Sequence, residues 1–300
     1  MTPSRMSYAV ITPARDEAQN LARLAPCLIA QHTKPVRWVV VDNGSKDGTA
    51  DVVGKFAEEH TWIELVQLNG PVRPNRETAV CRALEAGLAA LSDLPDIVVK
   101  VDADISFEPE FFDHLVAGFE REVGLGIASG SAYERSRTGV WQQRHGTGAG
   151  VWGAARAFRR ECLDEIAPLD PRLGWDGIDI LKSTLRGWNT RVIYEAQFKH
   201  HRPEGDRDGS RWNAWVAEGA AAHYMNYRLP YLVTRTVFRG LHDPRAFGIL
   251  WGYVRSHTRG EPRLPDPEVV KYLRSQQRLS QMRSRAREAT RKRDILLERE

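Results

Sequence analysis

The chain has 300 residues, 42% of them hydrophobic and 27% charged, which is ordinary for a globular protein that folds in water. It has no apolar run of about 20 residues, the length that a membrane-spanning helix needs, and its N-terminus turns polar too early for a secretory signal. Its cysteines, at 27, 81 and 162, form no C-x-x-C pair, which argues against a disulfide framework or a zinc site. We therefore expect a cytoplasmic protein with reduced thiols.

The net charge of +4 is unevenly distributed along the chain. Residues 262–300 hold 11 Lys or Arg and 6 Asp or Glu, so the rest of the chain is close to neutral. A basic nucleic-acid surface on the body of the protein is not expected. The basic tail reads as a polar helix with few large apolar residues, and a solvated tail is favoured over one bound to anionic lipid.

Short apolar runs alternate with helical patterns in the first half of the chain. The runs that predict buried strands are residues 8–12, 37–42, 62–67 and 97–102. The segments with apolar residues at helical spacing are 17–32, 48–60 and 76–93. This alternation predicts an α/β fold with a mostly parallel sheet flanked by helices, in which ligands bind beyond the carboxyl ends of the strands.

The pattern changes after residue 125. A strand is expected at 126–134, a glycine-rich and then helical segment at 144–166, and a second strand at 190–195. Helices are expected within 172–188 and at 212–227, 230–239 and 244–257. Residues 262–267 resemble a linker, and a long polar helix is expected from Glu268.

The sequence "VDAD" places Asp102 and Asp104 where the fourth apolar run ends. Two neighbouring carboxylates repel each other and resist desolvation. A divalent cation with oxygen ligands, Mg²⁺ or Mn²⁺, would remove that cost and could bridge to phosphate oxygens. The alternative is a solvated strand end without a ligand.

Two further motifs follow the first two strands. In "TPARDEAQNL", Pro13 is expected to end the strand and Glu17 to favour the helix N-terminus, whereas Arg15 could reach a nucleotide or phosphate. In "DNGSKDGT", tight turns explain most residues, and Asp47 or Thr49 is expected to be the N-cap of the next helix. Asp42 lies at the ligand edge, where its carboxylate could accept a hydrogen bond from a base or a ribose.

The motifs "VITPARDEAQNL", "VVVDNGSKDGT", "VDAD" and "GWDGIDILKSTLRGW", in this order, resemble the family 2 glycosyltransferases with the GT-A fold. The resemblance covers about residues 7–205. It implies a nucleotide pocket lined by Pro13, Ala14, Arg15, Glu17 and Asp42. Arg76 is also expected to bind the donor. It further implies that Asp102 and Asp104 serve the donor diphosphate and a Mn²⁺ or Mg²⁺ ion.

The resemblance also implies an acidic motif on the helix after the acceptor loop. Here Asp176 and Asp179 are kept, but Gly177 stands where a second adjacent acid is usual. The two acids are three residues apart and share a helix face, and either could take a proton from an acceptor hydroxyl. Asp176 is favoured because it begins the helix, and Asp179 is the alternative. The alternative without chemistry is that both acids stabilise the helix dipole.

The segment "FKHHRPEGDRDGSR" offers further ligands. His200 or His201 could complete the metal site, and Arg202, Arg207 and Arg211 could neutralise a diphosphate. An ordinary surface turn is the alternative. Trp175, beside the expected base, is the aromatic residue expected to contact the acceptor.

Together these features predict an inverting, metal-assisted glycosyltransferase that uses a UDP- or GDP-type sugar donor and a glycan or glycolipid acceptor. The expected parts are a catalytic domain (1–205), a helical extension (206–260) and a basic helical tail (261–300). The helical C-terminus is also where peripheral contact with the cytosolic face of a membrane is expected. The sequence does not fix the oligomeric state.

Other classes of protein share some of these sequence features. A haloacid-dehalogenase-type phosphatase also has a D-x-D strand end, but there the motif opens the fold, and here three strands precede it. A sugar nucleotidyltransferase would need a glycine-rich phosphate loop near the N-terminus, and this sequence has none there. A non-catalytic nucleotide-sugar-binding or scaffold protein is left open by Gly177.

Overall fold

The computed structural model describes residues 5–68, 76–91, 93–136, 138–144, 151–172, 174–202, 211–241 and 243–278, and at residues 76, 77 and 175 it describes the backbone alone. Its contacts divide the chain into two compact units. The first unit comprises Met1–Pro171 and Arg186–Pro203, and the second comprises Arg172–Leu185 and Glu204–Glu300. The boundaries expected after residues 205 and 260 stay predictions, and residues 279–300 of the tail lie outside the described residues.

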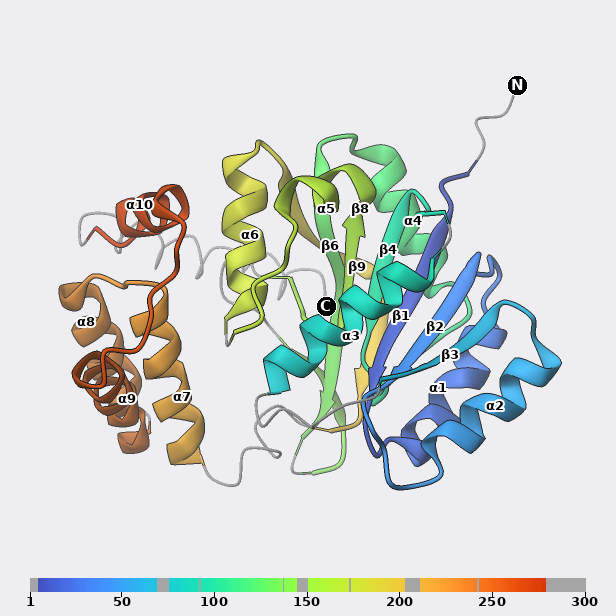
Figure 1. Cartoon of the computed structure of the whole chain (residues 1–300), viewed down its shortest axis with the longest axis horizontal. Helices are drawn as coiled ribbons and strands as arrows, with labels where there is room; N and C mark the ends of the chain where they lie inside the picture. Colours follow the sequence, from blue (N-terminus) through green and yellow to red (C-terminus); the bar gives the residue numbers. More distant parts are fainter. Residues whose placement is uncertain are drawn as a thin grey trace. The chain divides into compact units, whose positions relative to one another are not determined.

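The first half of the first unit alternates strands and helices, as predicted (Figure 1). The strands are β1 (Tyr8–Ala14), β2 (Arg37–Asp42), β3 (Ile63–Gln67) and β4 (Ile97–Val101), parallel in the order β3-β2-β1-β4. The helices are α1 (Ala18–Ile29), α2 (Thr49–Glu59) and α3 (Arg76–Ala90). β4 is buried at every residue, including Lys100, which explains why its other residues are all apolar: a strand that is covered on both faces of the sheet shows no polar alternation.

The expectation that Pro13 ends the first strand is wrong, because β1 continues through Ala14. β1 pairs with β2 up to Ala14, whereas its pairing with β4 stops at Ile11. Pro13 therefore lies where β1 has a strand partner on one side only. A proline is tolerated at such a position because no ladder hydrogen bond is required from it on the open side.

The rest of the first unit extends the sheet with antiparallel pairs. Its elements are β5 (Ile105–Phe107), α4 (Phe111–Arg121), β6 (Leu125–Arg135), β7 (Trp141–Gln143), β8 (Ala155–Arg159), α5 (Arg160–Ile166) and β9 (Asn189–His200). Among the described residues the strands form one nine-stranded sheet in the order β3-β2-β1-β4-β8-β6-β9-β5, with β7 paired to β6. The α/β class is confirmed, and the parallel half of the sheet is the part that the sequence predicted best.

Two strand predictions need correction here. The segment 144–166 was expected to be glycine-rich and then helical; it does end in the helix α5, but before it lies β8, which is between β4 and β6 and antiparallel to both. The strand expected at 190–195 is longer, since β9 runs to His200 and pairs with β5 there. Both strands bring residues close to the acidic motif. Asp102 N donates to Ala154 O, which directly precedes β8, and β9 ends at His200, the first histidine of the pair.

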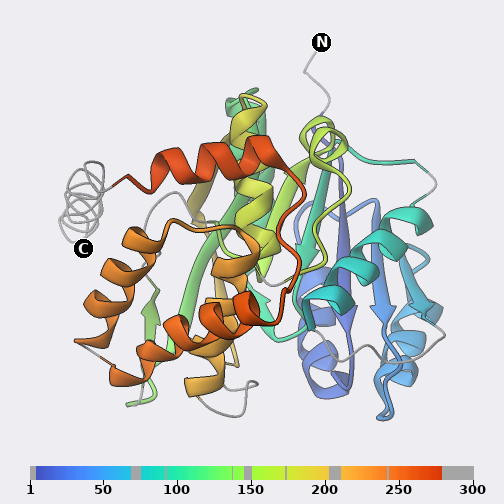
Figure 2. The same ribbon diagram turned by 60° about the vertical axis from the view of Figure 1, so that its left-hand side comes forward.

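The second unit is built of helices. Its elements are α6 (Trp175–Leu185), α7 (Arg211–Tyr224), α8 (Leu229–Gly240), the 3-10 helix η1 (Pro244–Phe247), α9 (Gly248–Thr258) and α10 (Pro267–Gln276). α10 packs across α6, and Ile178 of α6 is fully buried there among Tyr224, Val269 and Leu273 (Figure 2). Within the described part of the chain, no helix has both the length and the apolar character that crossing a membrane requires.

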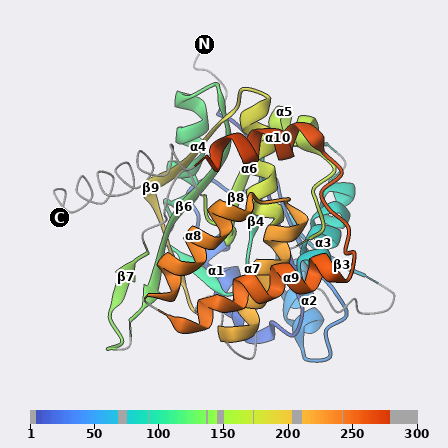
Figure 3. The same cartoon turned by 90° about the vertical axis from the view of Figure 1, so that its left-hand side faces the viewer.

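α7 and α9 lie side by side with their backbones in direct contact (Figure 3). Glycine permits this approach from both sides. A Cβ added at Gly219 of α7 would lie 2.0 Å from Ile249 O, and one added at Gly252 of α9 would lie 2.0 Å from Val216 O. Because the obstacle is backbone in each case, no side-chain rotation can relieve the clash.

Gly252→Ala should therefore destabilise the helical unit. Overpacking against backbone costs about 1–3 kcal/mol, and here we expect the upper end. Gly54→Ala is the matched control: Gly54 lies inside α2, and an added Cβ there would meet nothing within 4 Å. That control should stabilise by up to about 1 kcal/mol through helix propensity. Urea unfolding of the two variants should give shifts of opposite sign, and shifts of the same sign would contradict the packing described.

Candidate functional site

The loops after β1 and β2 are joined by hydrogen bonds. Ala14 and Asp42 are register partners at the strand ends. Beyond them, Asp16 N donates to Ser45 Oγ (2.9 Å) and Glu17 N donates to Thr49 Oγ1 (2.9 Å). Ala18 N donates to an Asp47 carboxylate oxygen at 3.1 Å. Side chains of the second motif thus accept hydrogen bonds from three consecutive N–H groups that lead into α1.

This cross-capping corrects the expectation for "DNGSKDGT". The N-cap of α2 is Gly48, which makes no side-chain cap, whereas Asp47 and Thr49 cap α1. Asp47 also accepts a hydrogen bond from Thr49 N at 2.9 Å. Most polar residues of this motif therefore hold the two loops together, a role that the interpretation as tight turns did not predict.

Asp42 is buried at the end of β2, with 3% of its surface exposed. Its Oδ1 accepts hydrogen bonds from Ser45 N (2.9 Å) and Ser45 Oγ (2.5 Å). One carboxylate oxygen therefore shapes the turn. Its expected role toward a nucleotide stays a prediction, as do the roles of Pro13 and Ala14 in β1. Arg15 is 41% exposed, and its Nε lies 4.0 Å from Asp16 Oδ2, so its guanidinium is accessible to a ligand.

The acidic motif after β4 has a positively charged neighbour. Asp102 Oδ1 lies 2.5 Å from Lys100 Nζ, and Lys100 is almost wholly buried in β4. The same ammonium donates to Gly153 O at 2.8 Å. Lys100 was missed by the sequence interpretation, although a lysine inside a continuous apolar strand was a usable signal.

Lys100→Met should destabilise the fold by about 2 kcal/mol, because it leaves Asp102 without its cation in a site that is only partly open to water. The side chain of Asp102 is 20% exposed, so solvent screening reduces the cost below that of a fully buried pair. Lys55→Met, at an exposed position of α2, is the control and should change stability by less than about 0.5 kcal/mol. Equal unfolding midpoints in urea for the two variants would show that the ion pair contributes nothing.

Asp104 is buried beside a guanidinium and an imidazole that come from the end of β9 and the residues after it. Its carboxylate lies 3.6 Å from Arg202 Nε and 3.5 Å from His200 Nε2. Arg202 NH2 also lies 2.7 Å from the carboxylate of Glu17, which is itself buried. Glu17 therefore does more than favour the helix dipole: through Arg202 it is connected to Asp104, so the first and third motifs meet at one guanidinium.

The two histidines have different surroundings. His200 lies between Asp104 and Glu134, whose carboxylate is 3.3 Å from His200 Nδ1. Burial works against its charged form, but the hydrogen bond and charge of Asp104 outweigh that effect, so the pKa of His200 is raised. His201 Nε2 lies 2.7 Å from Ser106 Oγ, and burial and the charge of Arg23 lower the pKa of His201.

A cavity of about 490 Å³ adjoins this cluster. Three arginines, Arg23, Arg135 and Arg202, line it together with Gln19, Asn20, Trp141 and His201. Among these described lining residues none is acidic, so the cavity suits an anionic ligand. Arg202 belongs to both the cavity and the Asp104 cluster. Arg207, the other arginine expected nearby, lies outside the described residues.

The carboxylates of Asp102 and Asp104 are hard oxygen donors, the kind of ligand that Mg²⁺ and Mn²⁺ prefer. Among the residues that the structure describes, no group of three or more His, Cys, Asp or Glu side chains is arranged to enclose a metal ion. Mg²⁺-type sites commonly use one or two carboxylates and take their remaining oxygens from water and substrate phosphates. Asp102 and Asp104 could supply such a pair, and the cations beside them, Lys100 and Arg202, would keep the two carboxylates in position.

The remaining predicted residues lie elsewhere in the chain. Asp176 and Asp179 lie on α6 in the second unit, whereas Asp102, Asp104, Glu17 and the histidines come together in the first. Asp176 is in the first turn, partly exposed, and its Oδ1 accepts from Gly177 N at 2.9 Å; Asp179 is fully buried. Arg76 is the first residue of α3 and Trp175 the first of α6, and their side chains lie outside the described residues.

Solved structures share this fold at low sequence identity. A mannosyltransferase from Pyrobaculum calidifontis in complex with GDP-Man and Mn²⁺ matches at TM-score 0.57 and 17% identity, over 88% of this chain and 78% of its own. TarS of S. aureus in complex with UDP matches at TM-score 0.53 and 16% identity, over 73% of this chain and 65% of its own. The fold is that of the GT-A glycosyltransferases.

The sequence comparison identifies the family. Glycosyl transferase family 2 matches residues 9–168, more than half of the chain, and the chain belongs to this family. An undecaprenyl-phosphate 4-deoxy-4-formamido-L-arabinose transferase of Pseudomonas fluorescens is 26% identical over 211 residues, 64% of this chain and 58% of the relative. The chain thus spans less than two thirds of that relative. Family membership favours sugar transfer over the phosphatase interpretation of the D-x-D motif.

Proposed function

We propose that this protein transfers a sugar from a nucleotide-diphosphate donor of the UDP or GDP type to a hydroxyl of a glycan or glycolipid. The observation that carries the proposal is the position of Arg202, which lies against both Glu17 of the first motif and Asp104 of the third, in a chain of family 2. The complexes of the similar structures with GDP-Man and with UDP support this donor class.

The donor is proposed to lie across the ends of β1 and β2. Pro13, Ala14, Arg15 and Asp42 would contact the nucleotide, and Arg76 would contribute from the start of α3. The diphosphate would lie toward Arg202, where the guanidinium can form paired hydrogen bonds with phosphate oxygens. Because Arg202 already spans two motifs, it would hold the donor without a large rearrangement of its own position.

In this proposal Asp104 and Asp102 would hold a Mn²⁺ or Mg²⁺ ion, and His200 or His201 would become a further ligand only when the ion is bound. When bound, such an ion stabilises the negative charge that develops on a leaving diphosphate. The chain's own contribution is to hold the two carboxylates in place through Lys100 and Arg202. Those same cations would offset diphosphate charge when it enters.

The base in this proposal is Asp176, which would take the proton from the acceptor hydroxyl in a single inverting displacement. Its partial exposure favours it over the fully buried Asp179. Trp175 would contact the acceptor. The names of the relatives, which include undecaprenyl-phosphate and dolichyl-phosphate transferases, support a glycolipid or envelope glycoconjugate as the product class.

Thermal stabilisation by nucleotides tests the donor site directly. UDP, GDP and TDP would each be added with Mn²⁺, with Mg²⁺ or with EDTA. A ligand at about 100 times its dissociation constant stabilises by about 2.7 kcal/mol, which a melting curve resolves readily. We expect a shift with UDP or GDP that EDTA removes. No shift with any nucleotide would contradict the proposed donor class.

A further inference from the structure

The solvent face of α8 is apolar. Its exposed large side chains include Leu229, Val233, Val237 and Phe238, with exposed fractions of 56%, 45%, 47% and 65%. All other exposed positions of this helix are also uncharged. Its two arginines are only partly exposed and are ion-paired with Glu218 of α7, at 2.7 Å for Arg239. The usual arrangement of a surface helix, with charges outside and apolar residues inside, is therefore absent from this helix.

The apolar surface continues onto η1 and α9. Leu241, just after α8, is 78% exposed, and Phe247, Trp251 and Val254 are 47%, 57% and 51% exposed. Phe247 adjoins α8, because a Cβ added at Gly240 would lie 2.9 Å from its ring. We call these exposed side chains, from Leu229 to Val254, the α8–α9 apolar face. Exposed apolar side chains gathered on neighbouring elements in this way are typical of an interaction site on a folded protein.

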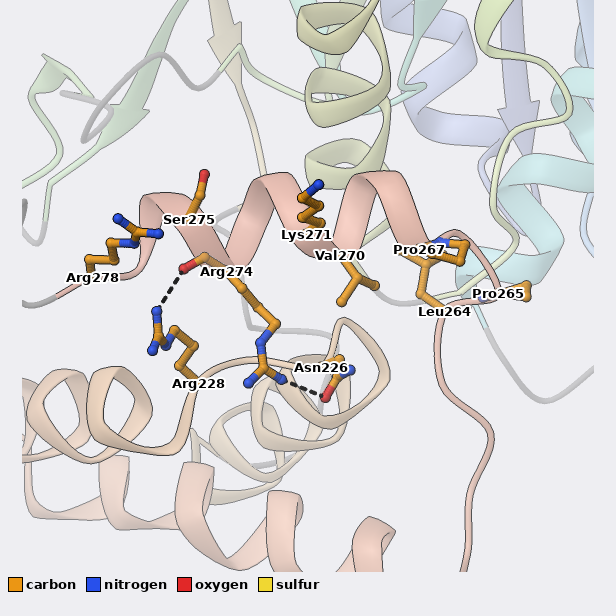
Figure 4. A pocket seen from close by; sticks show the side chains of 10 residues that line it. All are labelled: Asn226, Arg228, Leu264, Pro265, Pro267, Val270, Lys271, Arg274, Ser275 and Arg278. Carbon is orange, nitrogen blue, oxygen red and sulfur yellow. Dashed lines mark hydrogen bonds between the residues drawn. The ribbon is translucent and has the colours of Figure 1, made fainter.

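The surroundings of this face are strongly basic. Residues 211–278 carry eleven Lys or Arg and five Asp or Glu. Arg228, Lys271, Arg274 and Arg278 line a cavity of about 720 Å³ between α10 and the turn from α7 to α8 (Figure 4). None of the described residues that line it is acidic, and Arg274 is oriented by a hydrogen bond to Asn226 Oδ1 at 3.3 Å. Arg228 directly precedes Leu229, so the basic cavity adjoins one end of the apolar face.

We propose that the α8–α9 apolar face docks on the surface of an anionic lipid bilayer, with lipid phosphates at the basic cavity beside it. Apolar side chains that include Trp and Phe, bordered by arginine and lysine, suit the interface between acyl chains and headgroups. Each basic residue near an anionic leaflet adds attraction, whereas a neutral surface offers none. The positive charge of the helical unit therefore favours binding of its apolar face to an anionic bilayer over a neutral one.

A second copy of the chain is the less suitable occupant. In a two-fold dimer the same face meets itself, so the predominantly basic surroundings of the face would be brought close to those of the other copy. Like charges brought together at an interface oppose association. A bilayer with anionic headgroups presents the opposite charge. This surface lies beyond the proposed sugar transfer, since docking needs neither donor nor acceptor.

Sedimentation with lipid vesicles tests the proposal on the full chain. Wild-type protein should sediment with vesicles of phosphatidylcholine and phosphatidylglycerol, and at least about tenfold less with phosphatidylcholine alone or in 1 M salt. The variant V237S/F238S should lose at least about tenfold in vesicle binding, because it removes two exposed apolar side chains. V36S/V123S is its matched control, since Val36 and Val123 are 54% and 81% exposed in the first unit, and it should bind like wild type.

The charge contribution has its own variant pair. K271E/R278E should bind anionic vesicles at least about tenfold less, whereas K55E/R121E, which changes two exposed cations of the first unit, should have a much smaller effect. Wild-type protein that stays in solution with anionic vesicles would overturn the proposal, as would V237S/F238S that binds like wild type. A dimer in lipid-free solution that V237S/F238S converts to monomer would assign the face to a second copy and also overturn it.

Discussion

Asp104→Asn should remove the metal-dependent part of nucleotide binding and lower sugar transfer by at least about a thousandfold. The substitution keeps the size of the side chain but removes the charge that Arg202 and His200 face at 3.6 Å and 3.5 Å. An amide is also a poorer ligand than a carboxylate for a hard cation. Melting curves with UDP or GDP, with and without EDTA, measure the binding effect separately from catalysis.

Glu17→Gln is the matched control for that experiment. It removes the other carboxylate that holds Arg202, at 2.7 Å, but leaves both acids of the D-x-D motif in place. We expect it to weaken nucleotide binding while the remaining shift stays sensitive to EDTA. If Asp104→Asn keeps an EDTA-sensitive shift of wild-type size, the metal does not bind at Asp104. If both variants lose the EDTA sensitivity, the effect belongs to the position of Arg202.

Asp176→Asn should keep donor affinity but lower the rate of transfer by about 10² to 10⁴, the usual contribution of a general base. Asp176 is in the first turn of α6 and is partly exposed, so its carboxylate is accessible to an acceptor hydroxyl. The rate of transfer and the nucleotide-induced melting shift would be measured on the same preparation. The proposed role requires that the rate of transfer falls and that the nucleotide-induced melting shift stays the same.

Asp179→Asn, on the same helix, is the comparison. Asp179 has no exposed surface, so its replacement should act mainly on stability, by about 1–3 kcal/mol, the usual cost of disturbing a buried polar group. A low melting temperature with a nearly normal rate is the expected result for this variant. Full activity in Asp176→Asn together with loss of activity in a folded Asp179→Asn would move the base to Asp179.

The alternating half of the fold could be predicted because local signals agree with the tertiary structure there. β2 was predicted at its observed bounds, and Asp42 lies at its end as expected. β8 could not be recognised, because "ARAFR" is rich in residues with high helix propensity, and its strand conformation is imposed by pairing with β4 and β6 on either side. Such pairing partners are far away in the sequence and leave no local periodicity.

In the site, too, local sequence signals predicted some residues, but contacts between residues distant in the sequence could not be predicted. The carboxylates of the D-x-D motif could be found because they follow an apolar strand, but their partners come from distant positions. Arg202 is 98 residues after Asp104, and Glu134 meets His200 across 66 positions of the sequence. From the sequence, a divalent cation was the one source of positive charge considered for the two acids. Lys100 and Arg202 already supply positive charge, and a cation would add to them.

The bonds between the first two loops have a consequence for local opening. The amide hydrogens of Asp16, Glu17 and Ala18 are held by acceptors that belong to Ser45, Thr49 and Asp47. Deuterium can replace them only when the two loops separate, so their exchange rates report the free energy of that separation. Isotope exchange at the start of α1 would thus measure how often the proposed nucleotide pocket comes apart, in a protein to which no ligand has been added.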